Sequence, residues 1–308
     1  MSGRLRVAVV GTGRMGGAMA GRLAAGGHEV TVHNRTRSTA EAVADRHGAT
    51  VAGSAREAAL RADVIVVSLA DDEAVRATYG GADGLVAGLG PGQVVADTST
   101  VDPETVRSVG ADVAAMGASL VDTPVSGSVS TVEAGSLLVM AGGDEAALDR
   151  ARPALETFAG RVVHLGPLGA GATMKLAVNA MLHSLNCALS EALVLAEKAG
   201  IDRALAYEVI GASAVAAPFV AYKRDAFLHP EDAQVAFALE LVAKDLALAE
   251  ALADRVGAPM SQLVTNRALV DRAVGAGLGD ADLSALATLL RGDEEGRSGA
   301  TAPGGTRG

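Results

Sequence analysis

Short apolar runs separated by more polar, helix-forming stretches dominate the first half of the chain. Runs that predict buried strands lie at residues 5–10, 29–33, 62–68, 93–97, 137–141 and 161–165. Stretches of helical composition lie between them, at residues 14–25, 71–77, 102–116 and 144–158. Strands that alternate with helices predict a doubly wound parallel sheet of the α/β class, in which ligands bind at the carboxyl ends of the strands.

Strand patterns disappear in the second half. Nothing between Ala172 and Ala199 interrupts a helix, and Gly200 is a natural stop. At 1.5 Å per residue this helix spans roughly 45 Å, which is enough to connect two domains. Further helices are predicted at 202–213, 240–256, 259–274 and 280–291. We therefore expect a Rossmann-type domain at 1–166, an all-α domain at 167–291 that begins with the long inter-domain helix, and a disordered tail at 292–308.

Composition narrows the class of partner. The 308 residues carry a net charge of −10 and include no Trp, four Phe and three Tyr, which argues against nucleic-acid binding. The single cysteine, Cys187, cannot form an intrachain disulfide and fits a reducing compartment. Lys175, His183 and Glu191 make the long helix a poor membrane span. We expect a soluble cytoplasmic protein that does not bind membranes.

A glycine motif follows the first strand and opens the first helix. It reads Gly11, Thr12, Gly13, Arg14, Met15, Gly16. A motif of this form between a strand and a helix is typical of dinucleotide binding, because the first glycine permits the tight turn, the second admits the pyrophosphate and the third lets helix and strand pack closely. The helix N-terminus offers free N–H groups to the phosphates. A plain glycine turn without a ligand is the alternative.

The end of the second strand bears on the choice of cofactor. Asn34, Arg35, Thr36 and Arg37 stand where a carboxylate would bind the adenosine ribose and repel a 2′-phosphate. Guanidinium groups match a phosphate in charge and geometry, so this segment favours NADP(H) over NAD(H). The alternative is a pair of solvated arginines that open a helix.

Polar residues also follow later strands. Ser68 and Leu69 end one strand, and Thr98 and Thr100 end the next, where their hydroxyls are expected to line the nicotinamide-ribose region. The alternative role of this segment is helix capping, with Asp102 or Thr100 at the N-cap and Pro103 at a first helical position.

Two more groups of residues carry candidate chemistry. Ser126, Gly127 and Ser128 lie in a loop that is rich in small hydroxyl residues, and such a loop can hold a carboxylate or be an ordinary polar loop. Lys175 and Asn179 lie four residues apart and therefore on one face of the long helix. Alone, that pair is more often a solvated face than a catalytic one.

Taken together, these segments resemble the β-hydroxyacid dehydrogenases, the group that contains 3-hydroxyisobutyrate dehydrogenase, tartronate semialdehyde reductase and the glyoxylate/succinic semialdehyde reductases. The matching stretches are residues 11–16, 97–103, 123–128, 169–179 and 244–249. The chain departs from the family at Ser128, where a second glycine is frequent, and at Ala180, where a second asparagine is frequent. The semialdehyde reductases are the most similar subgroup.

The resemblance implies an NADP(H)-dependent oxidoreductase that interconverts a small β-hydroxy, γ-hydroxy or α-oxo acid and its semialdehyde or oxo form. It implies that Lys175 is the proton donor, that Asn179 orients it or the substrate, and that residues 126–128 hold the carboxylate. Phe237 is expected to contact substrate and Lys244 the cofactor. A homodimer or homotetramer without a metal is expected.

Three rival functions stay open. Imine reductases resemble this fold but usually replace the lysine, so Lys175 counts against them. A 6-phosphogluconate dehydrogenase is disfavoured because Val178-Asn179 stands where that family carries His-Asn. A non-catalytic NADP-binding scaffold is disfavoured because the lysine, asparagine and serine positions are all retained.

Overall fold

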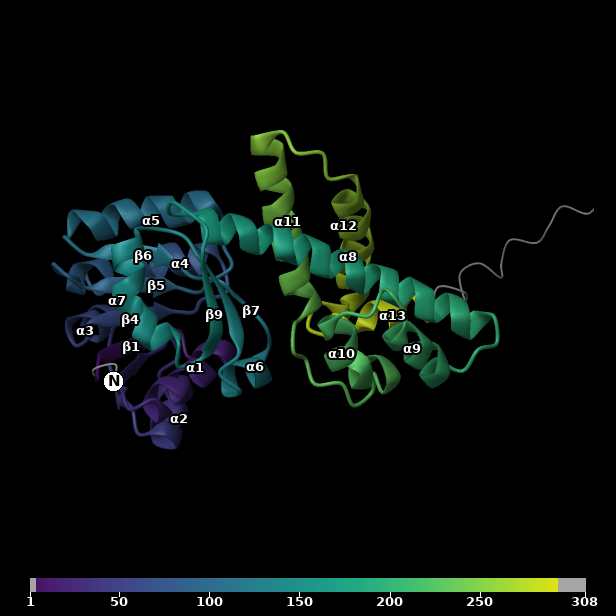
Figure 1. Cartoon of the computed structure of the whole chain (residues 1–308), viewed down its shortest axis with the longest axis horizontal. Coiled ribbons are helices and arrows are strands. Elements are labelled where there is room, and N and C mark those ends of the chain that lie inside the picture. The colour runs from purple at the N-terminus through teal and green to yellow at the C-terminus, as the bar shows by residue number, and fades with distance from the viewer. Residues whose placement is uncertain (1–3, 293–308) are drawn as a thin grey trace, which may run out of the picture. The chain divides into compact units, whose positions relative to one another are not determined.

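The computed structural model describes residues 4–292, which fold into two compact units (Figure 1). The division lies within one helix, between Ala177 and Val178, whereas the sequence placed the domain boundary at 166/167. Except for Gly292, the tail expected at 292–308 lies outside the described residues.

A six-stranded parallel sheet forms the centre of the first unit. Its strand order is β3-β2-β1-β4-β5-β6. The strands are β1 (Arg6–Val10), β2 (Glu29–His33), β3 (Thr50–Val51), β4 (Val64–Val67), β5 (Val94–Asp97) and β6 (Ser119–Asp122). The order reverses between β1 and β4, and this reversal is the place where doubly wound folds bind their ligands. The predicted α/β architecture is confirmed.

Alternating strand residues pack against helices on the two faces of this sheet. Val7 and Val9 belong to one core cluster, and Ala8 and Val10 belong to the other. The first cluster includes α1 (Arg14–Ala25), α2 (Arg37–His47) and α7 (Glu145–Leu155). The second includes α3 (Ala55–Leu60), α4 (Asp72–Tyr79) and α5 (Pro103–Ala115). Burial on both faces explains why the strands are apolar throughout.

A second, three-stranded sheet completes the first unit. It has the order β7-β8-β9, with β7 (Val125–Ser126) antiparallel to β8 (Leu137–Ala141) and β8 parallel to β9 (Ala159–His164). The short helix α6 (Val129–Glu133) lies between β7 and β8. Pro124 has no N–H to continue the ladder of the first sheet, and its carbonyl accepts a hydrogen bond from Met140 in β8 at 2.9 Å. The expected strands at 137–141 and 161–165 therefore exist, but in a sheet of their own.

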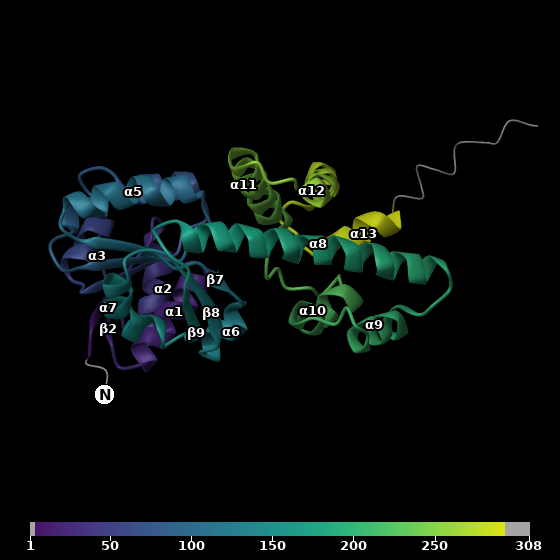
Figure 2. The ribbon, with the colours of Figure 1, turned by 45° about the horizontal axis from the view of Figure 1, so that its top comes forward.

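The second unit is helical, as predicted. Figure 2 shows α9 and α10 on one side of the long helix and α11 and α12 on the other. The unit contains α8 (Ala170–Lys198) from Val178 onward, α9 (Arg203–Ala212), α10 (Pro218–Leu228), α11 (Leu239–Val256), α12 (Ser261–Ala273) and α13 (Ala285–Gly292). A π-type turn, Val274–Leu278, follows α12.

The helix expected at 280–291 begins only at Ala285, which corrects the prediction. The reason is Asp282, whose carboxylate accepts hydrogen bonds from the backbone N–H groups of Ala236, Phe237 and Ser284. These bonds hold the segment before Ala285 in a turn.

By length and composition α8 could cross a membrane. Half of its most apolar window is buried inside the structure, and core helices of water-soluble proteins meet the same criterion. Four of its polar residues, Asn179, His183, Asn186 and Ser190, are buried. The helix therefore gives only weak evidence for a membrane span.

Candidate functional site

The glycine loop after β1 has a geometry that requires two of its glycines. Gly11 has a φ of +91°, and its N–H donates to the His33 carbonyl at 2.9 Å. A Cβ at Gly11 would lie 2.2 Å from the Ser68 carbonyl oxygen, and a Cβ at Gly16 would lie 2.0 Å from the Gly11 carbonyl oxygen. A Cβ at Gly13 would meet no atom within 4 Å. The loop is thus packed tightly on the protein side and open at Gly13.

The start of α1 is left open for an anion. Gly13 is its N-cap and provides no side-chain hydrogen bond, whereas Asp71, Asp102 and Asp144 cap α4, α5 and α7. The Thr12 hydroxyl is buried and has no hydrogen-bond partner among the described residues. An uncapped helix start, an orphaned hydroxyl and an empty space over Gly13 fit the pyrophosphate of a dinucleotide.

Asn34 supports this loop directly. Its Oδ1 accepts from the Thr12 N–H at 3.1 Å, and its Nδ2 donates to the Thr36 carbonyl at 3.1 Å. Arg37 is bound to Glu41 at 2.7 Å, so part of its charge is engaged. Arg35 is exposed and joins no other described side chain. Of the two arginines, Arg35 is therefore the better candidate for a 2′-phosphate.

The ends of β4 and β5 are joined by a buried hydrogen-bond network. The Thr98 hydroxyl donates to the Val67 carbonyl at 2.7 Å, and the Leu69 N–H donates to Ser99 Oγ at 3.0 Å. Asp97 accepts from Tyr79 Oη at 2.8 Å, and burial raises the pKa of this carboxyl. Thr98 is thus fixed to the sheet, and half-buried Thr100 is the more accessible hydroxyl. Of the two predicted N-cap candidates, Asp102 caps α5.

The serine loop follows β6 and β7. Ser126 ends β7 and is half-buried. Gly127 has a φ of +140°, and a Cβ there would lie 2.6 Å from Leu137 Cδ2, so this position requires glycine. Ser128 Oγ is 2.8 Å from Ser130 Oγ and its N–H donates to Thr131 Oγ1, so its hydroxyl takes part in the start of α6. Gly127 is exposed.

Lys175 lies on the first turns of α8, and a buried carboxylate fixes the start of this helix. Asp122, the last residue of β6, accepts from the N–H groups of Gly169 at 2.8 Å and Ala172 at 2.7 Å. Burial raises the pKa of Asp122, and the N–H donors of Gly169 and Ala172 oppose that rise. Lys175 is half-buried and lies three residues after Ala172. Asp122 did not stand out in the sequence, although its place at a strand end was a signal.

The other predicted residues gather around a second buried carboxylate, in the helical unit. Asn179 Nδ2 donates to Asp245 Oδ2 at 2.5 Å, and Lys244 Nζ lies 3.1 Å from Asp245 Oδ1. His183 Nε2 lies 3.9 Å from Asp245 Oδ2, and its ring centroid lies 5.7 Å from that of Phe237. Asp245 and His183 thus connect Asn179, Lys244 and Phe237. The sequence assigned no role to either residue: a Lys-Asp neighbour pair on a helix is usually solvated, and His183 counted only against a membrane span.

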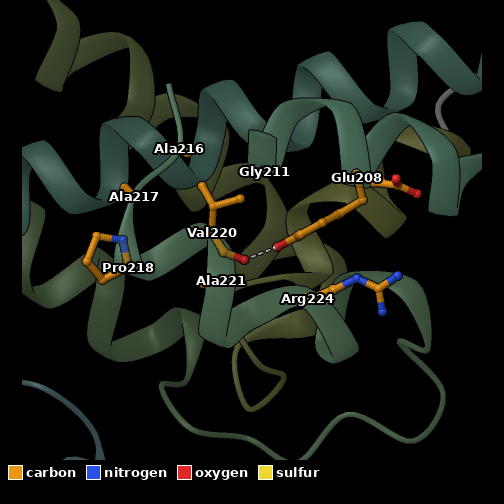
Figure 3. Close-up of a pocket in the computed structure, with 9 residues that line it drawn as sticks. Glu208, Gly211, Ala216, Ala217, Pro218, Val220, Ala221 and Arg224 are labelled. Atoms are coloured by element: carbon orange, nitrogen blue, oxygen red, sulfur yellow. Dashed lines mark hydrogen bonds between the residues drawn. The ribbon is translucent and has the colours of Figure 1, made fainter. Parts of the chain in front are cut away.

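A separate cavity of about 380 Å³ lies between α9 and α10 (Figure 3). Its lining is mostly aliphatic, with Glu208 and Arg224 as its charged residues. The Tyr207 hydroxyl donates to the Val220 carbonyl at 2.8 Å. None of the predicted site residues lines this cavity, and we assign it no part in the chemistry. Among residues 4–292, no cluster of three His, Cys, Asp or Glu side chains could hold a metal.

Both halves of the chain match models of known families. Residues 6–166 match the NAD-binding domain of 6-phosphogluconate dehydrogenase, and residues 169–290 match the NAD-binding domain of NADP-dependent 3-hydroxyisobutyrate dehydrogenase. Both descriptions name nicotinamide dinucleotide binding, which agrees with the geometry of the glycine loop.

Individual proteins give the same result. The chain is 32% identical to glyoxylate/succinic semialdehyde reductase 1 of Arabidopsis thaliana over 287 residues, which cover 93% of this chain and 99% of the relative. The structure of Mycobacterium tuberculosis 3-hydroxyisobutyrate dehydrogenase with L-serine superimposes with a TM-score of 0.82 at 33% identity, covering 94% of this chain and all of that one. An imine reductase from Pseudomonas sp. superimposes with a TM-score of 0.63 at 21% identity, covering 94% of this chain and all of that one, and shares the fold alone. The chain therefore belongs to the β-hydroxyacid dehydrogenase family and is a nicotinamide-dependent oxidoreductase that acts on CH–OH groups of small hydroxy acids.

Proposed function

We propose that the chain is an NADP(H)-dependent enzyme that interconverts a small hydroxy acid and its semialdehyde or oxo form, with Lys175 as the proton donor. One observation carries this proposal. Lys175 lies one turn beyond a helix start that is fixed to the carboxyl end of β6. The glycine loop, Ser68 and Thr98 follow strands of the same parallel sheet at the same edge.

The residues divide the chemistry between them. A bound nicotinamide supplies or accepts the hydride. The Lys175 ammonium stabilises the negative charge that develops on the substrate oxygen, and it gives up a proton there during reduction. Ser126, Gly127 and Ser128 are proposed to bind the substrate carboxylate, which needs N–H and O–H donors. Asn179 is proposed to orient Lys175 or the substrate, Phe237 to contact the substrate, and Lys244 to contact the cofactor.

The test of this proposal is the Lys175→Ala variant. We expect its turnover to fall by about 10²- to 10⁴-fold, the usual contribution of a general acid, while the Kd for NADPH stays within about twofold. Lys198→Ala, at the far end of α8, is the matched control and should keep full activity. Near-normal turnover of the Lys175 variant would reject the assignment.

A substrate screen defines the reaction. It compares glyoxylate, succinic semialdehyde, tartronate semialdehyde and methylmalonate semialdehyde with NADPH, and L-serine and 3-hydroxyisobutyrate with NADP⁺. Cyclic imines belong in the same screen, because their reduction in place of the oxo-acids would identify an imine reductase. NADPH binding without turnover of any of these compounds would identify a scaffold.

Assembly and location complete the proposal. We infer a homodimer or homotetramer, because the exposed apolar side chains Met181, Leu195, Leu205 and Val209 lie on α8 and α9. A cytoplasmic location is consistent with Cys187, which is buried and whose thiol pKa burial raises to about 12, so that it stays an unreactive thiol.

A further inference from the structure

We propose that Asp122 is a positioning residue for the reaction, because its carboxylate sets where the Lys175 helix begins relative to the serine loop. This inference rests on the proposed role of Lys175. It concerns residues of the first unit only. Asp122 itself is 1% exposed, so neither substrate nor solvent reaches its carboxylate.

The Asp122 carboxylate accepts one hydrogen bond from the residue just before α8 and one from the first turn of α8. Oδ1 accepts from the Gly169 N–H at 2.8 Å, and Oδ2 accepts from the Ala172 N–H at 2.7 Å. Two charge-assisted bonds from one rigid group fix both the position and the direction of the first turn. Lys175 is three residues further on, about 4.5 Å along the helix axis.

The backbone of Asp122 is held just as firmly. Its N–H donates to the Gly142 carbonyl at 3.0 Å, and its carbonyl accepts from the Gly142 N–H at 2.8 Å. The chain then reaches Ser126 in four residues, with Thr123 bound to the Asp97 carbonyl at 2.6 Å. One residue thus connects the strand that leads to the carboxylate-binding loop with the helix that carries the ammonium.

Two glycines are packed closely against this contact. A Cβ at Gly142 would lie 2.5 Å from Asp122 Oδ1 and 2.8 Å from the Gly171 nitrogen. A Cβ at Gly171 would lie 2.3 Å from the Met140 carbonyl oxygen and 2.9 Å from Asp122 Oδ2. Because Gly142 and Gly171 lack side chains, the end of β6 and the start of α8 lie close enough for the Asp122 carboxylate to connect them directly.

The test is a double-mutant cycle between Asp122→Asn and Lys175→Ala. The amide keeps the shape of the carboxylate but places an N–H₂ group against one of the two N–H donors. We expect kcat of Asp122→Asn to fall about a hundredfold, since a displacement of about 1 Å has this effect, while the Kd for NADPH stays within about twofold. In the Lys175→Ala background the same substitution should change kcat by less than about twofold, because its effect passes through the lysine.

Each result decides the question. An unchanged kcat, an equal loss of NADPH affinity, or a full further loss in the Lys175→Ala background would overturn the positioning role. If Lys175→Ala alone is fully active, it is the proposed function that fails. Asp144→Asn makes the same carboxylate-to-amide change at the N-cap of α7, a helix without site residues, and should leave kcat unchanged.

A second variant covers the case in which Asp122→Asn does not fold, as judged by circular dichroism. Gly142→Ala keeps the charge but wedges a methyl group between the carboxylate and the helix. We expect it to lower kcat in the Lys175 enzyme and to have less than about twofold effect in the Lys175→Ala background. A Gly142→Ala enzyme with normal kcat would overturn the proposal.

Discussion

At the scale of single residues, the structure separates side chains that the sequence treated alike. Arg35 and Arg37 formed one basic segment in the sequence, but Glu41 engages Arg37 alone. Gly11, Gly13 and Gly16 formed one motif, but only Gly11 and Gly16 pack against other backbone atoms. Residue spacing identifies the motif, whereas the role of each member depends on neighbours that are distant in the chain.

The difference between the arginines predicts cofactor selectivity. Arg35→Ala should lower the preference for NADPH over NADH about 10- to 100-fold, because a charge-assisted bond contributes about 1.5–3 kcal/mol, while NADH kinetics stay unchanged. Steady-state kcat/KM with both cofactors measures this ratio. Arg37→Ala is the matched control and should change the ratio less. A wild-type enzyme that uses NADH as efficiently as NADPH would contradict the NADP(H) assignment.

The glycines yield a second prediction, which separates a ligand cradle from a plain turn. Gly13→Ala should leave the melting temperature of the ligand-free protein nearly unchanged, since the new methyl group meets no atom within 4 Å. It should weaken NADPH binding at least about tenfold by occupying the approach of the pyrophosphate. Gly16→Ala should instead destabilise the ligand-free protein, because its Cβ would overlap the Gly11 carbonyl. Thermal shift measures the melting temperature of each variant, and NADPH titration measures its cofactor affinity. Unchanged NADPH affinity of Gly13→Ala would contradict a pyrophosphate site at this loop.

At the scale of elements, hydrophobic pattern and capping residues were enough to place most helices and strands. The elements that this pattern did not predict are the eleven-residue helix α10 and others that are short or depend on distant groups. The strand β3 has only two residues and the helix α3 only six. A serine, Ser54, caps α3 and was a signal in the sequence for its start. The serine loop contains β7 because Pro124 turns the chain towards β8, and this pairing partner is not adjacent in sequence. In the same way, the carboxylates of Asp122 and Asp245 acquire their roles from residues 47 and 66 positions away.

Asp282 is the clearest case of an element boundary set by a tertiary contact. Its carboxylate pairs with Lys223 Nζ at 2.7 Å, and it also binds three backbone N–H groups, which ends any helix before Ala285. Burial pulls its pKa upward, but the bonds to Lys223 and the backbone outweigh burial and hold the pKa below its ordinary value. A lowered folded pKa means that the ionised carboxylate stabilises the fold at neutral pH.

This contact predicts an acid-sensitive helical unit. Asp282→Asn should lower the free energy of unfolding at pH 7 by about 3–5 kcal/mol, since it leaves Lys223 buried without its partner. The difference between variant and wild type should shrink as pH falls below about 4, because the pKa of the native carboxylate lies below its ordinary value of 3.8 and the stabilising charge is lost as pH falls through that pKa. Urea denaturation at several pH values measures it. Asp280→Asn, an exposed control two residues earlier, should match wild type at every pH. A difference that is independent of pH would contradict the assigned ionisation.

At the scale of the whole molecule, an exposed apolar surface remains in the helical unit. Met181 and Leu195 on α8 are 78% and 73% exposed, and Ala188 lies midway between them. A spacing of seven residues puts all three on one face of the helix. On α9, Leu205 and Val209 are 54% and 61% exposed and lie four residues apart. Large apolar side chains exposed on one helix face are typical of interaction surfaces, and the proposed homo-oligomer would bury them.

Charge determines how this association should respond to salt. Each chain carries a net charge of −10, so two copies repel each other at low ionic strength, and association must come from apolar area. Light scattering coupled to size exclusion should therefore show a dimer or tetramer that persists or strengthens when salt rises, because screening removes repulsion and leaves the apolar contact intact. Met181→Glu with Leu195→Glu should dissociate it, since the variant would bury unpaired carboxylates. Leu60→Glu, at a 61% exposed leucine of the first unit, should not. A monomer at micromolar concentration, or equal dissociation by the Leu60 variant, would show that the α8 face is not the contact.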